Sequence, residues 1–109
     1  MKLPADSEIA RIKATQYLLK LREEDDKSKF LAQAGYTAAH AEKLLQDLRG
    51  LLAADAEFVQ KTEYGDKYQI CGTLTGPNGR TLRVTSIWMI ERATGKTKFV
   101  TLYPDKNEI

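Results

Sequence analysis

The stretch from Tyr64 to Pro104 alternates between apolar and polar side chains, and this pattern limits the possible folds more than any other feature. Because successive side chains of a strand point to opposite faces of a sheet, odd and even positions define two separate surfaces. The even positions are apolar: Tyr68, Ile70, Leu74, Leu82, Val84, Trp88, Ile90, Val100 and Leu102. The odd positions are rich in hydroxyl and basic groups: Lys67, Gln69, Thr73, Thr75, Thr81, Arg83, Thr85, Thr101 and Tyr103. The even face therefore needs a cover, and the odd face is left for solvent or function.

Two turns divide this stretch into strands. Gly76-Pro77-Asn78-Gly79 and Ala93-Thr94-Gly95-Lys96 have the residues that turns require, since Pro presets φ and Gly or Asn accept positive φ. The first of them lacks the Lys-Ser/Thr of a phosphate-binding loop, so we interpret it as a turn only. Strands are expected at residues 56–64, 67–75, 80–91 and 97–103, with a hairpin turn at Gly65-Asp66 and Pro104 ending the last strand.

Upstream of residue 56 the apolar residues recur at helical spacing. Helices are expected at residues 6–22, 27–34 and 38–52, with Gly35 ending the second and Thr37 capping the third. Helices followed by strands indicate the α+β class, and short connections make successive strands antiparallel neighbours. The sequence thus predicts two to three N-terminal helices packed on the even face of a four-stranded antiparallel meander sheet.

The 109 residues are expected to form one domain, with a helical part (1–55), a sheet (56–104) and a loose tail (105–109). The net charge of +2 is too small to mark a nucleic-acid binder by itself. One cysteine, no secretory signal and no apolar run long enough for a membrane span together predict a cytoplasmic protein. With one histidine and one cysteine, no metal site is expected, and no cofactor motif is found.

Several motifs resemble a small bacterial family known only as a domain of unknown function. They are Tyr64-Gly65-x-Lys67-Tyr68, Gly72-Thr73-Leu74-x-Gly76-Pro77-Asn78-Gly79 and Val100-Thr101-x-Tyr103-Pro104, with Tyr17-Leu18-Leu19 and Lys27-x-Lys29-Phe30 upstream. Members of that family often carry a His-Pro where this chain has Glu24-Asp25-Asp26. If that histidine is catalytic in the relatives, this chain lacks it. The resemblance implies the fold and a bacterial-type origin, and it brings no established activity.

The expected architecture is also similar to the barnase–EndoU–colicin–RelE group of small ribonucleases and toxins. Those proteins place catalytic residues on the open face of the sheet and on the adjoining helix. The resemblance implies that the odd face would be the working surface here, although a fold alone does not imply a function.

The first functional hypothesis is an RNA-directed, toxin-like domain of a toxin–antitoxin-type pair, which cleaves RNA without a metal if it is an enzyme. In this hypothesis Arg83 stabilises the phosphate with help from Lys67, and Tyr103 or His40 transfers protons. The substrate would be positioned by Thr85, Thr101, Lys27 and Lys29. The alternative interpretation of these residues is a solvated sheet face and an exposed surface histidine.

The second hypothesis is a non-catalytic interaction module. Ile87, Met89 and Phe99 also occupy odd positions and would add an apolar patch to the same face. This patch would bind a partner protein, such as one encoded by the neighbouring gene. A homodimer formed through the edge strand that ends at Tyr103 is a third alternative. The sequence leaves these three hypotheses open.

Overall fold

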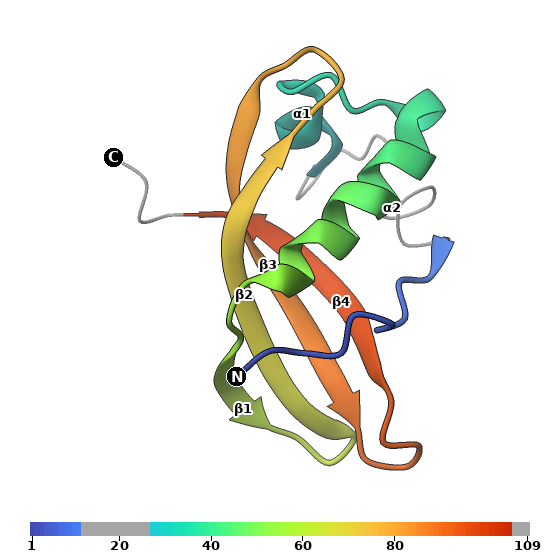
Figure 1. Ribbon diagram of the computed structural model, residues 1–109, viewed down its shortest axis with the longest axis vertical. Coiled ribbons are helices and arrows are strands. Elements are labelled where there is room, and N and C mark those ends of the chain that lie inside the picture. Colours follow the sequence, from blue (N-terminus) through green and yellow to red (C-terminus); the bar gives the residue numbers. More distant parts are fainter. Residues whose placement is uncertain (12–26, 106–109) are drawn as a thin grey trace.

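The computed structural model describes residues 1–11 and 27–105 and has the predicted α+β architecture (Figure 1). The helical elements are α1 (Lys27–Ala32), the 3-10 turn η2 (Ala38–His40), α2 (Ala41–Gly50) and the 3-10 turn η3 (Leu51–Ala53). They precede the strands β1 (Glu57–Lys61), β2 (Gly65–Thr75), β3 (Thr81–Glu91) and β4 (Thr97–Pro104). The strands form one antiparallel sheet in the order β1-β2-β3-β4, which confirms the predicted meander. None of the helices in the described ranges is long and apolar enough to cross a membrane.

The helices cover the even face of the sheet, as the alternation predicts. In Figure 1, α2 runs diagonally along the right-hand side of β2, and α1 overlaps the upper end of β2 in this view. The core residues of α2 are Leu44 and Leu48, both fully buried, which follow the expected helical spacing. They share one core with Ile70, Val84 and Trp88 of the sheet. The opposite, odd-numbered side of β2 and β3 carries none of the described helices, and we call it the open face.

A buried polar chain at the centre of the core fixes the position of Trp88. The indole Nε1 donates to Ser86 Oγ at 2.8 Å, and Ser86 Oγ donates to the carbonyl oxygen of Ile70 at 3.0 Å. Ser86 and Trp88 are both fully buried. The serine therefore satisfies an indole N–H that would otherwise be buried without a partner.

The side chains of β4 do not all lie on the faces of the sheet that parity predicts. Trp88 pairs with Phe99 and Ile87 pairs with Thr101, so Val100 is an extra residue that forms a β-bulge. An extra residue reverses the alternation, and Phe99 therefore lies in the core, 2% exposed, with its ring centroid 5.3 Å from that of Trp88. The prediction that Phe99 lies on the open face is wrong. Parity alone could not reveal a bulge.

The first predicted helix is also corrected at its start. Its residues 12–22 lie outside the described ranges, but Glu8, predicted to be helical, forms a parallel bridge with Lys98. The Glu8 N–H bonds the carbonyl of Thr97 at 2.8 Å, and its own carbonyl accepts from the N–H of Phe99 at 2.8 Å. These bonds to the edge of β4 occupy the backbone groups that a helix would use.

The first hairpin turn lies at Thr62–Tyr64, and Gly65 opens β2 instead of forming the turn. A Cβ atom on Gly65 would come within 2.2 Å of the carbonyl oxygen of Ile90. Glycine is therefore required here for the close approach of β3 and not for a turn. Gly35 has φ +90° after α1, and Gly79 and Gly95 have positive φ in the two predicted turns, so these three glycines have the predicted roles.

Ser86→Ala should lower the free energy of unfolding by about 1–3 kcal/mol, because it leaves the Trp88 indole N–H buried and unpaired. Urea unfolding followed by tryptophan fluorescence measures the change. Thr73→Val is the control, since it removes an exposed hydroxyl and should stay within about 0.5 kcal/mol of the wild type. Equal effects of the two substitutions would contradict this role of Ser86.

The alkaline stability of the domain should depend on Tyr36. Burial, together with the hydrogen bond to Asp47 and its charge, raises the pKa of Tyr36 above the ordinary value. In the unfolded chain a tyrosine ionises near pH ~10, so the stabilising effect is complete below that pH and is lost as the pH rises from there. The difference in unfolding free energy between wild type and Tyr36→Phe should therefore shrink above pH ~10. A difference that stays constant between pH ~8 and ~11 would exclude this linkage.

Candidate functional site

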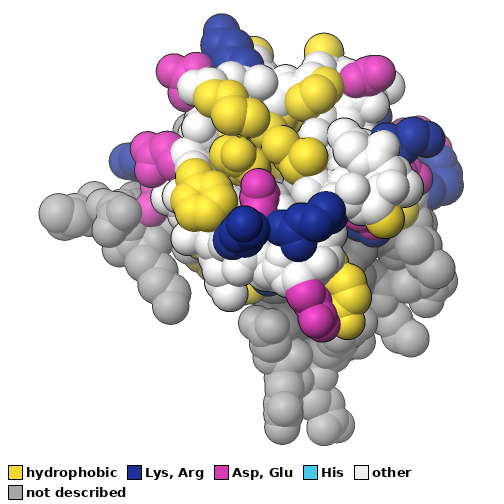
Figure 2. Space-filling view, turned by 90° about the horizontal axis from the view of Figure 1, so that it is seen from below, with side chains coloured by type: hydrophobic (Ala, Val, Ile, Leu, Met, Phe, Trp, Pro, Cys, Tyr) yellow, Lys and Arg dark blue, Asp and Glu magenta, His cyan; other side chains and the backbone are white. Residues whose placement is uncertain are grey.

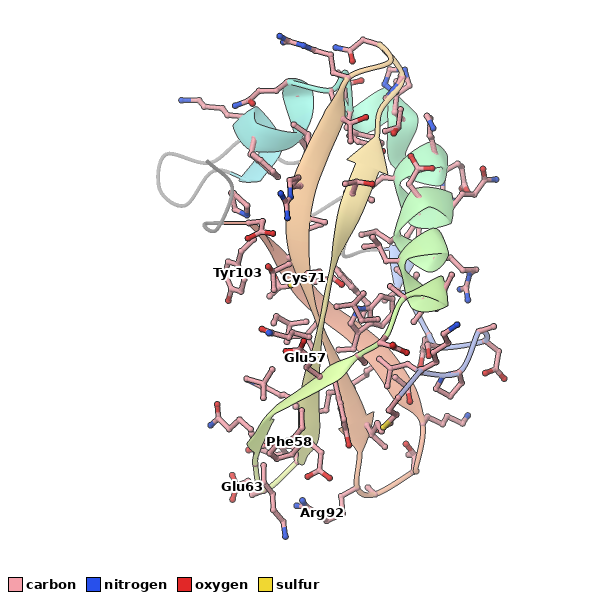
Figure 3. All side chains as sticks on the ribbon, turned by 60° about the vertical axis from the view of Figure 1, so that its left-hand side comes forward. Glu57, Phe58, Glu63, Cys71, Arg92 and Tyr103 are labelled. Carbon is pink, nitrogen blue, oxygen red and sulfur yellow. The ribbon has the colours of Figure 1, made fainter. Side chains whose placement is uncertain are left out.

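The open face carries a row of side chains from three strands. Thr85 pairs with Cys71 on one side and with Tyr103 on the other. The Cys71 Sγ and Thr85 Oγ1 atoms are 3.7 Å apart. In Figure 3, Cys71 and Tyr103 are labelled at mid-height of the sheet, on the side away from α2. Tyr103 is 45% exposed, so part of it faces solvent.

Arg83 lies beside this row and is tied to the end of β4. Its Nη2 atom is 3.5 Å from Asp105 Oδ2, and the backbone N–H of Asp105 donates to the Arg83 carbonyl at 3.0 Å. The Asp105 side chain is 6% exposed, whereas that of Arg83 is 53% exposed. Asp105 thus holds a guanidinium that still faces solvent, although the sequence places Asp105 in a loose tail.

A small depression adjoins Arg83 where β4 has already ended. It measures about 240 Å³ and is lined by Phe30, Gln33, Arg80, Thr81, Leu82 and Arg83. Pairing with β4 reaches only to Val84, so the first residues of β3 have no strand on that side within the described ranges. Two arginines therefore border one depression at the upper end of the sheet. We call Arg80, Arg83, Thr85, Tyr103 and Asp105 the Arg83 cluster.

Only part of the predicted catalytic set meets at this cluster. Arg83, Thr85 and Tyr103 are neighbours, since residues two positions apart on adjacent strands lie within reach of long side chains. Lys67 pairs with Met89 and lies six positions along β2 from Thr73, the partner of Arg83. At the rise of a strand this separation is roughly 20 Å, so Lys67 does not assist Arg83 within the described fold.

The remaining predicted substrate residues are placed differently. Thr101 is 6% exposed, so it does not offer a free surface hydroxyl. Lys29 is exposed on α1, the helix that contributes Phe30 to the depression. The side chain of Lys27 lies outside the described part of the structure.

His40 does not join the Arg83 cluster. It lies in η2, in the helical layer that covers the even face, and its Nδ1 is 2.8 Å from Thr37 Oγ1. Thr37 makes no side-chain hydrogen bond to the helix backbone, so the predicted cap does not form. Among the described residues, no group of His, Cys, Asp and Glu side chains could hold a metal ion.

The predicted partner-binding patch loses one of its three members. Ile87 and Met89 lie half-buried on the open face, next to Gln69 and Lys67 respectively. Phe99 faces the core instead. The apolar part of the open face is therefore smaller than the sequence predicts.

Sequence reasoning missed Arg80 and Asp105. Arg80 precedes β3 at an even position, which the alternation assigns to the apolar face, and Asp105 follows the strand-ending Pro104. The available signal was charge, since Arg80 is the first residue of one predicted strand and Asp105 follows Pro104 at the end of another.

A second exposed surface lies at the other end of the sheet, near the β1–β2 hairpin. Phe58, Val59 and Tyr64 are 59%, 45% and 69% exposed. Seen from this end, hydrophobic side chains gather at the centre of the surface with charged side chains at their border (Figure 2). The ring of Phe58 packs edge-to-face on Tyr68, with centroids 5.8 Å apart.

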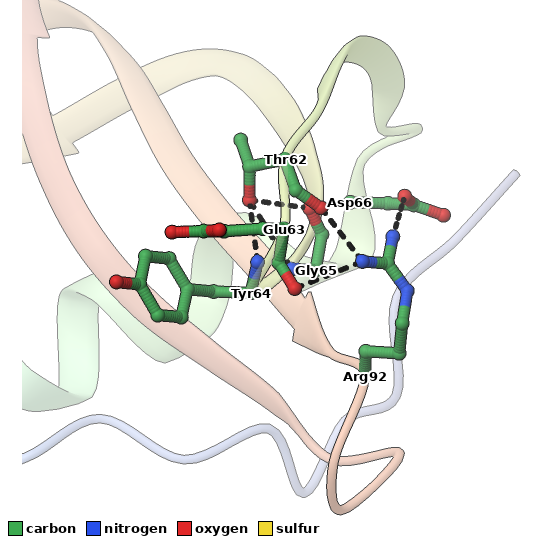
Figure 4. Close-up of polar contacts among 6 residues, drawn as sticks. All are labelled: Thr62, Glu63, Tyr64, Gly65, Asp66 and Arg92. Carbon is green, nitrogen blue, oxygen red and sulfur yellow. Dashed lines mark hydrogen bonds and ion pairs between the residues drawn. The ribbon is translucent and has the colours of Figure 1, made fainter.

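Arg92 holds this hairpin in place (Figure 4). Its Nη1 donates to the carbonyls of Thr62 at 2.7 Å and Glu63 at 3.0 Å, and its Nη2 is 3.4 Å from Asp66 Oδ1. Thr62 Oγ1 accepts the N–H groups of Tyr64 and Gly65, both at 3.2 Å. The Arg92 guanidinium thus ties the end of β3 to the β1–β2 turn.

Comparisons with known proteins agree with this fold. A chain of a contact-dependent growth inhibition toxin–immunity protein complex from Klebsiella pneumoniae 342 superimposes with a TM-score of 0.67. The alignment covers 91% of this chain and 100% of that chain at 17% identity, a level at which the likeness shows the fold. No curated protein matches the sequence. The family described as "Domain of unknown function (DUF6883)" matches residues 2–106, and this chain therefore belongs to the DUF6883 family.

Proposed function

We propose that this domain is a toxin-related protein that binds single-stranded RNA at the Arg83 cluster and cleaves it without a metal. The observation that carries the proposal is the meeting of Arg83, a threonine hydroxyl and an exposed tyrosine on the open face, with Arg80 bordering the depression beside Arg83 at the edge of the sheet. Phosphates are bound by arginine, and unstacked bases are bound by aromatic rings, so this combination suits a flexible RNA strand.

The phosphate would bind between Arg80 and Arg83. A guanidinium offers paired donors that match two phosphate oxygens, and its charge does not depend on pH in the physiological range. Asp105 supports phosphate binding by Arg83, because its carboxylate holds the guanidinium in place while about half of the Arg83 side chain faces solvent. We therefore assign Arg83 to phosphate binding and Asp105 to positioning Arg83.

The position of Tyr103 favours a role in binding RNA over a role in proton transfer. Its ring is close to half exposed and lies beside the Thr85 hydroxyl, where a base could stack next to the bound phosphate. Tyrosine phenols in general ionise far above neutral pH, which makes them poor general bases there. Base stacking is thus the first role of Tyr103, and proton transfer is the second.

Cleavage would use the RNA's own 2′-hydroxyl as the nucleophile. The 2′-oxygen forms a bond to phosphorus while the bond from phosphorus to the 5′-oxygen breaks. The 2′-hydroxyl gives its proton to solvent water, and the leaving 5′-oxygen takes one from water or from the Tyr103 phenol. The products are a 2′,3′-cyclic phosphate and a free 5′-hydroxyl. In this reaction Arg83 stabilises the negative charge that develops on the phosphate oxygens, and Tyr103 is the nearest predicted proton-transfer group.

The structural likeness supports the biological setting of the proposal. The similar solved chain belongs to a complex of a growth-inhibition toxin with its immunity protein. A toxic ribonuclease requires such a neutralising partner, which would be encoded nearby. The partner-binding hypothesis therefore complements the RNA hypothesis, and the half-buried Ile87 and Met89 favour the open face as one place where a partner could bind.

Arg83→Ala should weaken RNA binding and reduce cleavage about 100-fold, because it removes the main donor to the phosphate. Binding of a short labelled single-stranded RNA and gel analysis of total RNA measure the two effects. The salt dependence of binding should fall by the equivalent of about one phosphate contact. Lys61→Ala removes the same charge at the opposite end of the sheet and should change neither result.

If the wild type binds RNA without cleaving it, the ribonuclease part of the proposal is wrong. If Arg83→Ala binds RNA as tightly as Lys61→Ala, the assignment of the phosphate site is wrong.

Two substitutions at Tyr103 separate stacking from proton transfer. Tyr103→Phe keeps the ring and should bind RNA with wild-type affinity, whereas Tyr103→Ala should bind about 5- to 150-fold more weakly. The same binding assay measures both variants, and single-turnover cleavage shows whether the hydroxyl matters for the reaction. Wild-type affinity of Tyr103→Ala would show that the ring does not contact RNA.

A further inference from the structure

The outer edge of β2 is uncovered beyond the end of β1. Pairing between β1 and β2 spans Asp66 to Gln69, whereas β2 continues to Thr75. Among the described strands, none pairs with the outer side of Cys71–Thr75. A strand edge of this kind presents unpaired backbone donors and acceptors.

The register shows which groups point outward. In an antiparallel pair, both backbone groups of a residue point to the same side. The Arg83 carbonyl accepts from Asp105, so Arg83 turns toward β4, and its partner Thr73 turns away from β3. By the same alternation, Cys71 and Thr75 also direct their N–H and C=O groups outward.

One contact confirms this direction. The hydroxyl oxygen of Tyr36, whose proton is shared with Asp47, lies 3.2 Å from the Thr75 carbonyl oxygen on the outer side. The outward N–H and C=O groups of Thr73 have no such partner within the described residues.

A groove of about 720 Å³ runs along this edge, between β2 and α2. Its walls are Lys43, Gln46, Asp47 and Gly50 of α2 and Gly72–Gly76 of the sheet. Leu51, Ala53 and Ala54 close the end nearest β1. Lys43 Nζ and Asp47 Oδ2 form an ion pair at 3.0 Å, so the helical wall carries no net charge.

We propose that this groove binds an extended segment of a second protein, which adds a strand to the outer edge of β2. The outward groups of Cys71 and Thr73 need backbone partners at strand spacing, and only an extended chain supplies them in series. The Thr75 carbonyl is already contacted by Tyr36 and Gly76 lies against Ala34, so the open part of the edge runs from Cys71 to Leu74. At about 3.3 Å per residue, it accommodates roughly four residues.

The two sides of the added strand would meet different surroundings. One side faces the groove floor at Gly72 and Leu51, where a Cβ on Gly72 would come within 2.7 Å of Leu51 Cδ2, so small apolar side chains fit there. The other side lies next to the exposed hydroxyls of Thr73 and Thr75 and favours polar side chains. The expected partner segment therefore alternates small apolar and polar residues.

A second copy of this chain fits the groove less well. Antiparallel pairing of two β2 edges requires a two-fold axis perpendicular to the sheet, which keeps both α2 helices on the same face. Each α2 lies along its own β2 edge, so the two helices would compete for one groove. A different protein is the better occupant, and a solved chain with a similar fold comes from a complex of a toxin with its immunity protein. The proposal is independent of RNA cleavage at the Arg83 cluster.

The test uses the full chain and the protein encoded by the adjacent gene. Amide hydrogen exchange by NMR should show fast exchange at Cys71 and Thr73 in the free chain and strong protection in the mixture. Thr73→Pro removes the outward N–H without touching the bonds to β3 and should weaken the affinity at least about tenfold. Thr73→Val keeps the N–H and should bind as the wild type does.

If Thr73→Pro does not fold, Gln46→Trp tests the same site from α2, since an indole at this exposed position fills the groove. Gln60→Trp, on the exposed β1, is its matched control and should leave binding unchanged. RNA cleavage by the unmixed variants is measured in parallel. A variant that loses partner binding but still cleaves RNA shows that the groove and the proposed activity are separate.

Three outcomes would overturn the proposal. One is failure of the neighbour's product to bind, and another is binding that leaves the Thr73 amide unprotected. The third is protection of the Cys71 and Thr73 amides from exchange already in the free chain. If that protection depends on protein concentration, a second copy occupies the groove. If it does not, a segment of the same chain occupies it.

Discussion

The continuous pairing of β2 with β3 is the interaction on which the rest of the structure depends. It runs without a register shift from Gly65 opposite Glu91 to Thr75 opposite Thr81. Both neighbouring strands are shorter and pair with only part of it. The same pairing places Ile70, Ser86 and Trp88 under the helices, and it lines up Thr85 and Arg83 on the opposite side. Core and candidate site are thus two faces of one hairpin.

The unequal strand lengths create both proposed binding regions. Because β4 stops pairing at Val84, the start of β3 is left beside α1, and the Arg80–Arg83 depression forms there. Because β1 stops at Gln69, the end of β2 is left beside α2, and the long groove forms there. One region offers guanidinium groups, which suit an anionic chain, and the other offers backbone groups, which suit a peptide. The geometry therefore gives the domain two separate surfaces that a substrate and a partner could occupy at once.

The sequence predicted the parts of the fold that follow from local periodicity. The alternation in β2 and β3 identified Ile70, Val84 and Trp88 as core and Arg83 and Thr85 as open-face residues, because no bulge interrupts those strands. Phe99 could not be assigned in this way, since a single extra residue at Val100 reverses the faces of β4. Lys67 shares a face with Arg83, but parity contains no information on distance along the strand. Asp105 could not be identified from the sequence, because its role depends on its tertiary contact with Arg83.

The core contact between α2 and β3 has a consequence for synthesis of the chain. Leu44 and Leu48 are fully buried only together with residues such as Trp88, which follow about forty residues later in the sequence. At a translation rate of about 5–20 residues per second, the apolar side of α2 leaves the ribosome several seconds before its cover exists. During that interval the nascent chain exposes a leucine stripe that holdase chaperones bind. The domain is therefore expected to depend on the rate of translation across β2 and β3 for its yield of folded protein.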